Sequence, residues 1–301
     1  MPTTYYHVVF TLPEPIARIA FYNKQTVYNL LFRATSQTLL AIAADPSRLG
    51  VELGFFCVLH SWGQNLHFHP HLHCVVPGGG LSPDHRQWIG GKRRFFLPVK
   101  VLSRRFQHLF LDALEKAYAG GHLQFFGELQ ALRDPAAFAQ YLAPLRKSKW
   151  VVYAKPPFGG PERVLEYLGR YTHRVAISNR RLLAMEDGQV SFSWKDYRDG
   201  GKDKVMTVAA GEFIRLFLQH SLPPGLQRIR YYGFLANAHR QRQLELCRRL
   251  LQTGCSRLLP SLAACGRLPL LTTTHRRLCP QCGADALCRI RLPPPPRFDR
   301  S

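Results

Sequence analysis

Five histidines lie within fourteen residues of one another, namely His60, His67, His69, His71 and His73. An even spread of the thirteen histidines would place roughly 0.6 in such a window, so composition alone does not explain the cluster. In His71-Leu72-His73, the side-chain period of two in a strand would turn both imidazoles to one face and Leu72 into the core. Because imidazole binds many divalent metals, these residues predict a metal site without fixing the metal.

The residues after the histidine pair indicate which chemistry to expect. A zinc hydrolase that activates water would follow the pair with an Asp and a His, in the pattern H-x-H-x-D-H. Val75 and Val76 occupy those two positions. We therefore expect the nucleophile to come from elsewhere in the chain.

Tyr167 and Tyr171 are candidate nucleophiles. The segment from Glu162 to Tyr171 has the composition of a helix, and a spacing of four places both phenols on one face of it. Three arginines flank the pair: Arg163, Arg170 and Arg174. Cationic neighbours favour the phenolate and hold phosphate, which a tyrosine needs in order to displace a sugar oxygen. Taken alone, the spacing would also suit ordinary surface aromatics of a helix.

Strands and helices alternate along the chain in a way that predicts an α/β (α+β) fold. Strands are expected at Tyr5 to Leu12, Val51 to Leu59, His71 to Val76, Arg94 to Pro98 and Trp150 to Ala154. Helices are expected at Ile16 to Ala44, Ser103 to Ala119, Ala136 to Leu142 and Glu212 to His220. The prolines from Pro156 to Pro161 indicate a turn, and hairpin strands follow at Arg181 to Met185, Val190 to Trp194 and Val205 to Val208.

The charge of the chain points to a polyanionic partner. The sequence has 41 Lys plus Arg against 19 Asp plus Glu, a net charge of +22. Such a balance favours nucleic acid, although anionic membranes and ribosomal assembly also attract basic proteins. No stretch reaches the roughly 18 apolar residues that span a bilayer, and residues 1–20 do not have the pattern of a signal peptide. We therefore expect a cytoplasmic protein with no membrane partner.

Three longer strings resemble a known family. They are His69-Pro-His-Leu-His-Cys74, Trp150-Val-Val-Tyr-Ala-Lys-Pro-Pro-Phe-Gly-Gly160 and Glu166-Tyr-Leu-Gly-Arg-Tyr-Thr-His-Arg-Val-Ala-Ile-Ser178. Trp194-Lys-Asp-Tyr-Arg198 and Arg228-Ile-Arg-Tyr-Tyr-Gly-Phe234 add to the likeness. Together they resemble the rolling-circle transposases of the two-tyrosine HUH class, the IS-ninety-one type of bacterial insertion sequence. The match runs from about Tyr5 to Leu250.

The resemblance implies a fold, a site and a reaction. It implies a central antiparallel sheet flanked by helices over residues 1–235, followed by a basic helical tail over residues 236–301. His71 and His73 would hold Mg²⁺ or Mn²⁺ together with a third ligand. For that ligand we choose Gln64, with His69 and His60 as alternatives. The tyrosines would nick single-stranded DNA at element ends and target, forming a 5′-phosphotyrosine linkage with no nucleotide cofactor, and Lys195 joins the three arginines as a DNA-binding residue.

The sequence also departs from the family's usual pattern. Members usually carry a cysteine-rich zinc-binding region ahead of the strand that here begins at Tyr5, and we expect this chain to lack it. Near the other end, Cys279 and Cys282 form a C-x-x-C pair, which supplies half of a structural zinc site. Two other functions stay open: a catalytically inactive or truncated DNA-binding remnant of a transposase, and a metal-dependent phosphodiesterase that uses water.

Overall fold

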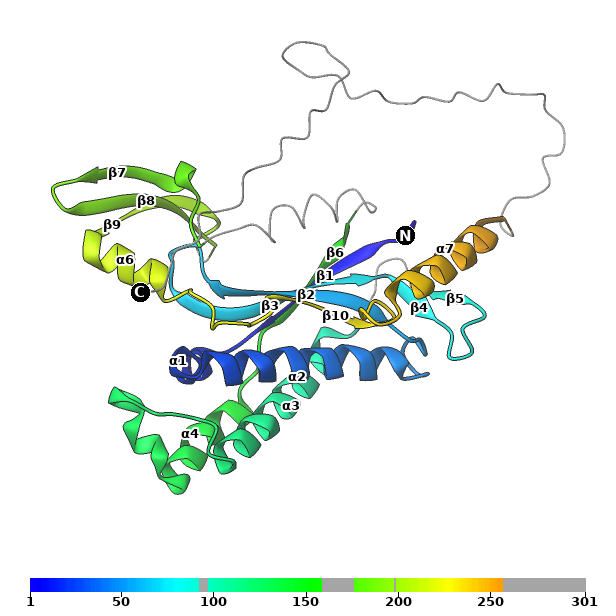
Figure 1. The fold of residues 1–301 in the computed structure, drawn as a ribbon, viewed down its shortest axis with the longest axis horizontal. Helices are drawn as coiled ribbons and strands as arrows, with labels where there is room; N and C mark the ends of the chain where they lie inside the picture. The colour runs from blue at the N-terminus through cyan, green and yellow to red at the C-terminus, as the bar shows by residue number, and fades with distance from the viewer. Residues whose placement is uncertain (92–96, 159–175, 198, 257–301) are drawn as a thin grey trace, which may run out of the picture. The chain divides into compact units, whose positions relative to one another are not determined.

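The computed structural model describes residues 1–91, 97–158, 176–197 and 199–256. Its centre is a five-stranded sheet in the order β10-β2-β3-β1-β6, in which all neighbouring strands are antiparallel (Figure 1). The strands are β1 (Tyr5–Thr11), β2 (Gly54–Trp62), β3 (Phe68–Pro77), β6 (Val152–Phe158) and β10 (Ile229–Gly233). The predicted mixed fold with a central antiparallel sheet is confirmed.

Helices cover one face of this sheet. They are α1 (Glu14–Tyr22), α2 (Lys24–Ala44), α3 (Val99–Ala119) and α4 (Pro135–Lys147), with a short 3₁₀ helix, η1 (Gly127–Arg133), before α4. The alternate residues Val8 and Phe10 of β1 and Leu72 of β3 are fully buried against this layer. Phe32 of α2 and Phe106 of α3 lie in the same core. The opposite face of the sheet carries the alternate residues of the same strands.

The helix expected from Ile16 to Ala44 is interrupted, which corrects the sequence prediction. Asn23 separates α1 from α2 with a non-helical backbone. Its side-chain amide donates to the carbonyls of Ile19 and Gln124 at 2.9 and 2.8 Å, and its Oδ1 accepts from the Gln124 N–H at 2.7 Å. These hydrogen bonds satisfy the buried amide at the break, and periodicity does not reveal the two that involve Gln124, 101 residues away.

The turn expected at the prolines begins later than predicted. β6 continues through Pro156 and Pro157 to Phe158. It lies at the edge of the sheet, where a proline costs no ladder hydrogen bond on the outer side. The strand expected at Arg94 to Pro98 falls largely outside the described residues.

A second, three-stranded antiparallel sheet lies beside the β2–β3 connection (Figure 1). Its elements are β7 (Leu182–Glu186), β8 (Gln189–Asp196), β9 (Lys202–Ala209) and the helix α6 (Ala210–Leu218), with η2 (Asn179–Arg181) leading into it. Phe192 of β8 and Leu216 of α6 are buried with Leu66 of the β2–β3 connection. This shared cluster attaches the second sheet to the end of the first at which the histidines lie.

The last described helix is α7 (Arg240–Ser256), and the small strands β4 (Gly79–Leu81) and β5 (Trp88–Gly90) form a separate pair. Cys247 of α7 is buried with Leu81 and Phe234. A compact unit spans Met1–Leu258, so α7 packs with the sheet-containing part of the chain. Cys279 and Cys282 lie outside the described residues. Among the helices that the structure describes, none is long and apolar enough to cross a membrane.

Candidate metal centre

The histidines of β3 lie on the sheet face opposite to the one that α1, α2, α3 and α4 cover. Strand geometry alternates side chains, and Leu72 and Cys74 enter the helix-covered core. His71 and His73 therefore point to the opposite face, where Val75 joins a small apolar cluster with Val58 of β2. The arrangement expected from His71-Leu72-His73 is confirmed.

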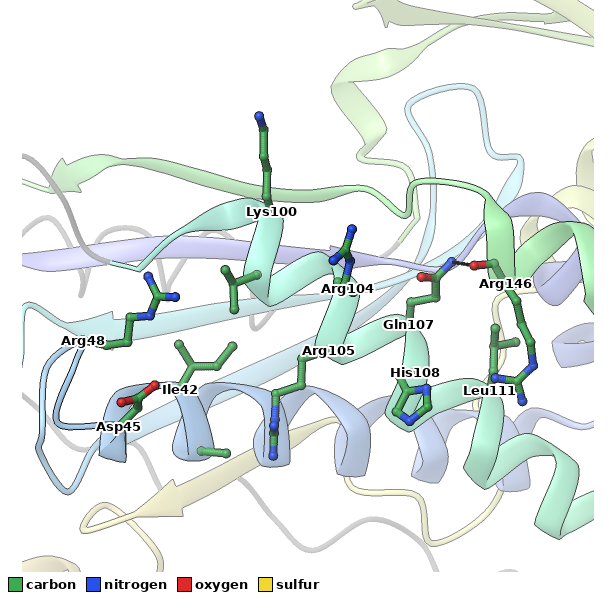
Figure 2. Close-up of a pocket in the computed structure, with 12 residues that line it drawn as sticks. Ile42, Asp45, Arg48, Lys100, Arg104, Arg105, Gln107, His108, Leu111 and Arg146 are labelled. Atoms are coloured by element: carbon green, nitrogen blue, oxygen red, sulfur yellow. Dashed lines mark hydrogen bonds between the residues drawn. The ribbon is translucent and has the colours of Figure 1, made fainter.

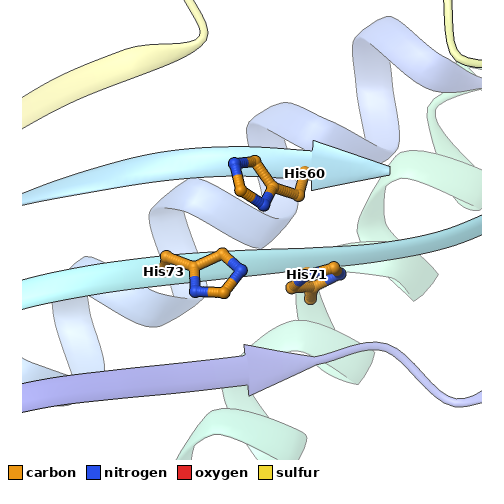
Figure 3. Close-up of side chains that lie close together, drawn as sticks. All are labelled: His60, His71 and His73. Carbon is orange, nitrogen blue, oxygen red and sulfur yellow. The ribbon is translucent and has the colours of Figure 1, made fainter. Parts of the chain in front are cut away.

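A third imidazole reaches the same place from β2. His60 lies directly opposite His71 in the antiparallel register. One ligand atom from each of His60, His71 and His73 lies within 4.8 Å of the other two (Figure 3). The ring centroids of His60 and His73 are 4.4 Å apart, and those of His71 and His73 are 4.8 Å apart. Three nitrogen donors at this separation are compatible with one divalent metal ion.

Hydrogen bonds fix the orientation of two of these rings. The Nδ1 atom of His71 lies 2.6 Å from the backbone carbonyl of His69, so Nδ1–H donates and Nε2 carries a lone pair. The Nδ1 atom of His73 lies 2.7 Å from Nε2 of the buried His7 on β1. Metal-binding histidines ordinarily use their second nitrogen in this way, which fixes the tautomer and the ring orientation. The donor set therefore fits a bound cation.

Two further features of the histidines suit metal binding: the protonation state of His71 and the packing of His60. Removal from water lowers the pKa of His71 to about 4, so this ring is neutral near pH 7, the form that binds a metal. His60 is buried and stacks on Trp62, with ring centroids 4.9 Å apart. This stacking restricts the orientation of the His60 ring near the end of β2.

The residues proposed or considered as a third ligand occupy different places. His69 is exposed at the start of β3, two residues before His71. Gln64 lies half-buried in the β2–β3 connection, where its backbone carbonyl accepts a hydrogen bond from the Arg181 guanidinium. His60, the other alternative, converges with His71 and His73. The role of Gln64 stays a prediction.

Most of the predicted nucleophiles and DNA-binding residues lie outside the described residues. These are the two tyrosines, Tyr167 and Tyr171, and the three arginines around them. Lys195 is exposed on β8 of the second sheet, opposite Asp203 of β9. The structure thus places Lys195 on a different sheet from the histidines.

Sequence reasoning missed His7 as part of this centre. The strand containing it was predicted, but its position depends on β1 pairing with β3, where His7 lies opposite Val75 and Val9 opposite His73. The available signal was the period of two, which places His7 and Val9 on the same strand face. Only the long-range register identifies that face as the one that carries the metal centre.

The antiparallel sheet, the three imidazoles and the net charge of +22 are together compatible with a metal-binding protein that acts on nucleic acid. Comparison with known proteins identifies the family. Residues 54–243 match the family described as "Putative transposase". The chain therefore belongs to this transposase family, and the family expected from the sequence is confirmed.

Individual relatives agree with this assignment. The chain is 60% identical over 297 residues to "Putative transposase y4qJ" of Sinorhizobium fredii, covering 97% of this chain and 74% of that protein. It is 28% identical over 232 residues to "Transposase for insertion sequence element IS801" of Pseudomonas savastanoi pv. phaseolicola, covering 77% of this chain and 54% of that protein. The chain thus spans about half the length of the second relative.

Solved structures of the conjugative relaxase TrwC also match. One is a complex with a 27-mer DNA comprising the recognition hairpin and the cleavage site, with 12% identity, a TM-score of 0.28, and coverage of 81% of this chain and 73% of that chain. Another is a complex with mutant OriT DNA, with 13% identity, a TM-score of 0.29, and coverage of 80% and 72%.

Proposed function

We propose that this chain nicks and rejoins single-stranded DNA in rolling-circle transposition, using tyrosine nucleophiles beside a histidine metal centre. One observation carries the proposal: three imidazoles converge on the sheet face opposite the helices α1 to α4, in a chain of a transposase family. Tyr167 and Tyr171 are the proposed nucleophiles, on the strength of their spacing and their arginine neighbours in the sequence.

The proposed reaction conserves the phosphodiester energy. A tyrosine oxygen bonds to the scissile phosphorus, and the bond from phosphorus to the 3′ oxygen of the preceding nucleotide breaks. The phenol proton ends on that oxygen, which leaves a 5′-phosphotyrosine and a free 3′-OH. Rejoining is the reverse step: a 3′-OH attacks phosphorus, and the tyrosine recovers its proton. Neither water nor ATP is consumed, and two tyrosines allow two linkages at once.

The proposed cofactor is Mg²⁺ or Mn²⁺, held by His71 and His73 with His60 or Gln64 as the third ligand. When bound, such an ion polarises the scissile phosphate and offsets its charge. Mg²⁺ prefers oxygen ligands, whereas imidazole nitrogens suit transition metals, so the donor set favours Mn²⁺ over Mg²⁺ in affinity. The residues that carry this preference are the three convergent histidines.

The sheet face that carries the histidines also has a feature that suits a single strand. Tyr153 on β6 lies opposite Val9, which lies opposite His73, so all three side chains share this face. Tyr153 is 52% exposed. Exposed aromatic rings bind single strands by stacking on unpaired bases. Arg163, Arg170, Arg174 and Lys195 are the proposed phosphate contacts.

A covalent-adduct assay tests the proposal. The protein is incubated with Mn²⁺ and single-stranded oligonucleotides that tile the DNA flanking its gene. A label at the 3′ end follows the fragment that becomes attached through its 5′ phosphate, so wild-type protein should give a labelled band at the size of the protein on a denaturing gel. The Tyr167→Phe/Tyr171→Phe double variant should bind the same DNA but give no cleavage and no adduct, because each change deletes only the nucleophilic oxygen.

Tyr197→Phe is the matched control, because Tyr197 is 71% exposed in the turn that follows β8. It should form the adduct as wild type does. Cleavage by the double variant with products free of protein would instead identify water as the nucleophile and favour a phosphodiesterase. Binding without cleavage by wild-type protein on every oligonucleotide would favour the DNA-binding remnant.

A further inference from the structure

A basic groove lies on the helical side of the molecule, between the end of α2 and the first half of α3 (Figure 2). It is an open hollow of about 950 Å³. We call it the basic groove, and its charged lining residues are Asp45, Arg48, Lys100, Arg104, Arg105 and Arg146. Five cations and one acid therefore surround a single depression.

Most of this positive charge is not neutralised by an ion pair among the described residues. Lys100, Arg104 and Arg105 are exposed, and none of them forms an ion pair with another described residue. Arg146 differs, because its guanidinium lies 3.2 Å from Asp112 and 2.7 Å from Glu115. Asp45 accepts hydrogen bonds from Ser47, which hold its pKa below the ordinary value. The three cations of α3 are thus available to an external anion.

The groove has a rigid base. α3 and α2 pack along their lengths through the main core, with Phe106, Leu111 and Ile42 buried. The Gln107 side-chain amide donates to the carbonyls of Leu145 and Ser148 at 2.6 and 2.7 Å, which fixes the end of α4 beside α3. A cation array on such a base contacts a ligand without first ordering the backbone that carries it.

The basic groove and the metal centre lie on opposite sides of the central sheet. α2 and α3 pack on the face that buries Leu72, whereas His71 and His73 point away from that face. Figure 3 shows the three imidazoles in front of the strands with helices behind them. A nucleic acid held in the groove is therefore a different segment from the one at the histidines.

The lining of the groove indicates which form of nucleic acid it takes. Its apolar members are Ala41, Ile42, Val101 and Leu111, and among the described residues no Phe, Tyr or Trp lines it. Single strands are ordinarily bound by aromatic stacking, whereas Lys and Arg contacts to phosphate suffice to position a duplex. We propose that the basic groove binds the phosphate backbone of double-stranded DNA, while the opposite face handles a single strand.

The role of this second surface rests on the proposed function. Strand transfer involves a nicked single strand and the duplex from which it comes or into which it moves. A duplex site behind the sheet would hold that second segment without occupying the metal centre. Its phosphate contacts would make the binding independent of base sequence and sensitive to salt.

The test uses the full chain and a labelled blunt 24-base-pair duplex of arbitrary sequence, with binding followed by fluorescence anisotropy between about 50 and 200 mM salt. In the variant Lys100→Gln/Arg104→Gln/Arg105→Gln, duplex affinity should fall about ten-fold or more. The slope of log affinity against log salt should flatten by about 2.7, at roughly 0.9 for each lost phosphate contact. Glutamine is a good helix former, so α3 should be retained.

The matched control removes three exposed cations that do not line the groove: Arg33→Gln/Arg86→Gln/Lys116→Gln. It has the same net charge as the groove variant, and it should keep the greater part of the duplex affinity and slope. Equal losses in the two variants would overturn the proposal, because net charge alone would then explain the binding. Unchanged duplex affinity in the groove variant would overturn it as well.

A second readout separates this proposal from the nicking activity. The groove variant should cleave a short single-stranded oligonucleotide with Mn²⁺ as wild type does, because the metal centre is untouched. Parallel loss of single-strand cleavage and duplex binding would show that the groove is not a separate site. If wild type does not nick, the duplex measurement still decides whether the groove binds DNA.

Discussion

Nε2 of His7 lies 2.7 Å from Nδ1 of His73, so a buried hydrogen bond joins β1 to the metal centre on β3. The two rings are nearly parallel, with an interplanar angle of 9° and centroids 5.0 Å apart. Because this bond uses Nδ1 of His73, a metal would bind this ring through Nε2. His7 is thus a positioning residue for His73.

Replacing His7 by Ala should weaken Mn²⁺ binding by about 10- to 100-fold, the usual effect of removing a partner that orients a metal ligand. Isothermal titration of the metal-free protein measures this directly. His7→Gln should recover part of the affinity, because its amide oxygen can accept from His73 Nδ1–H. The exposed His67 provides the control, and His67→Ala should bind Mn²⁺ as wild type does. An unchanged affinity in His7→Ala would remove the positioning role.

The identity of the third ligand can be decided by comparing two single variants. If His60 completes the site, His60→Ala should reduce Mn²⁺ affinity by at least as much as His71→Ala, and Gln64→Ala should leave it nearly unchanged. The geometry favours this outcome, because His60 converges with His71 and His73. The opposite order of effects would assign the role to Gln64. Thermal unfolding without metal checks that neither variant has lost its fold.

The difference between the sequence prediction and the structure follows from the range of the interactions involved. The strand containing His71 and His73 and its buried Leu72 follow from a local period of two. The convergence of His60 and the contact from His7 depend on how β2, β3 and β1 pair, which neighbouring residues do not encode. The break at Asn23 has the same origin, because its partner Gln124 is 101 residues away.

Acid should destabilise the fold partly through His220. Burial lowers the pKa of this ring to about 4, and it lies 3.3 Å from Ser61 Oγ and 2.9 Å from the Leu66 carbonyl. Between the ordinary pKa of about 6.5 and 4, the unfolded chain binds a proton that the folded chain does not. The contribution is therefore fully present above about pH 6.5 and is lost as the pH falls to 4, by up to roughly 3 kcal/mol.

Urea unfolding at pH 7, 5.5 and 4.5 tests this sign. The free energy of unfolding of wild type should fall across the series, and His220→Gln should show a smaller fall because glutamine does not titrate. The difference between the two proteins isolates His220 from the other histidines. Parallel pH profiles would contradict the prediction.

The edge strand β10 depends on a glycine that no other residue can replace. Gly233 has a φ of +58°, and a Cβ atom there would lie 1.6 Å from the backbone carbonyl oxygen of Leu53. The contacting atom belongs to the backbone of Leu53, so it cannot rotate away as the end of a flexible side chain could. Gly233→Ala should therefore lower the free energy of unfolding by about 3 kcal/mol or more, from left-handed strain and overpacking together.

Gly121 separates the two effects, because its φ is +70° but a Cβ there would meet nothing within 4 Å. Gly121→Ala should cost only about 1–2 kcal/mol of strain. Urea denaturation of the three proteins measures both losses, and equal losses would mean that the close approach to Leu53 does not constrain β10 against β2.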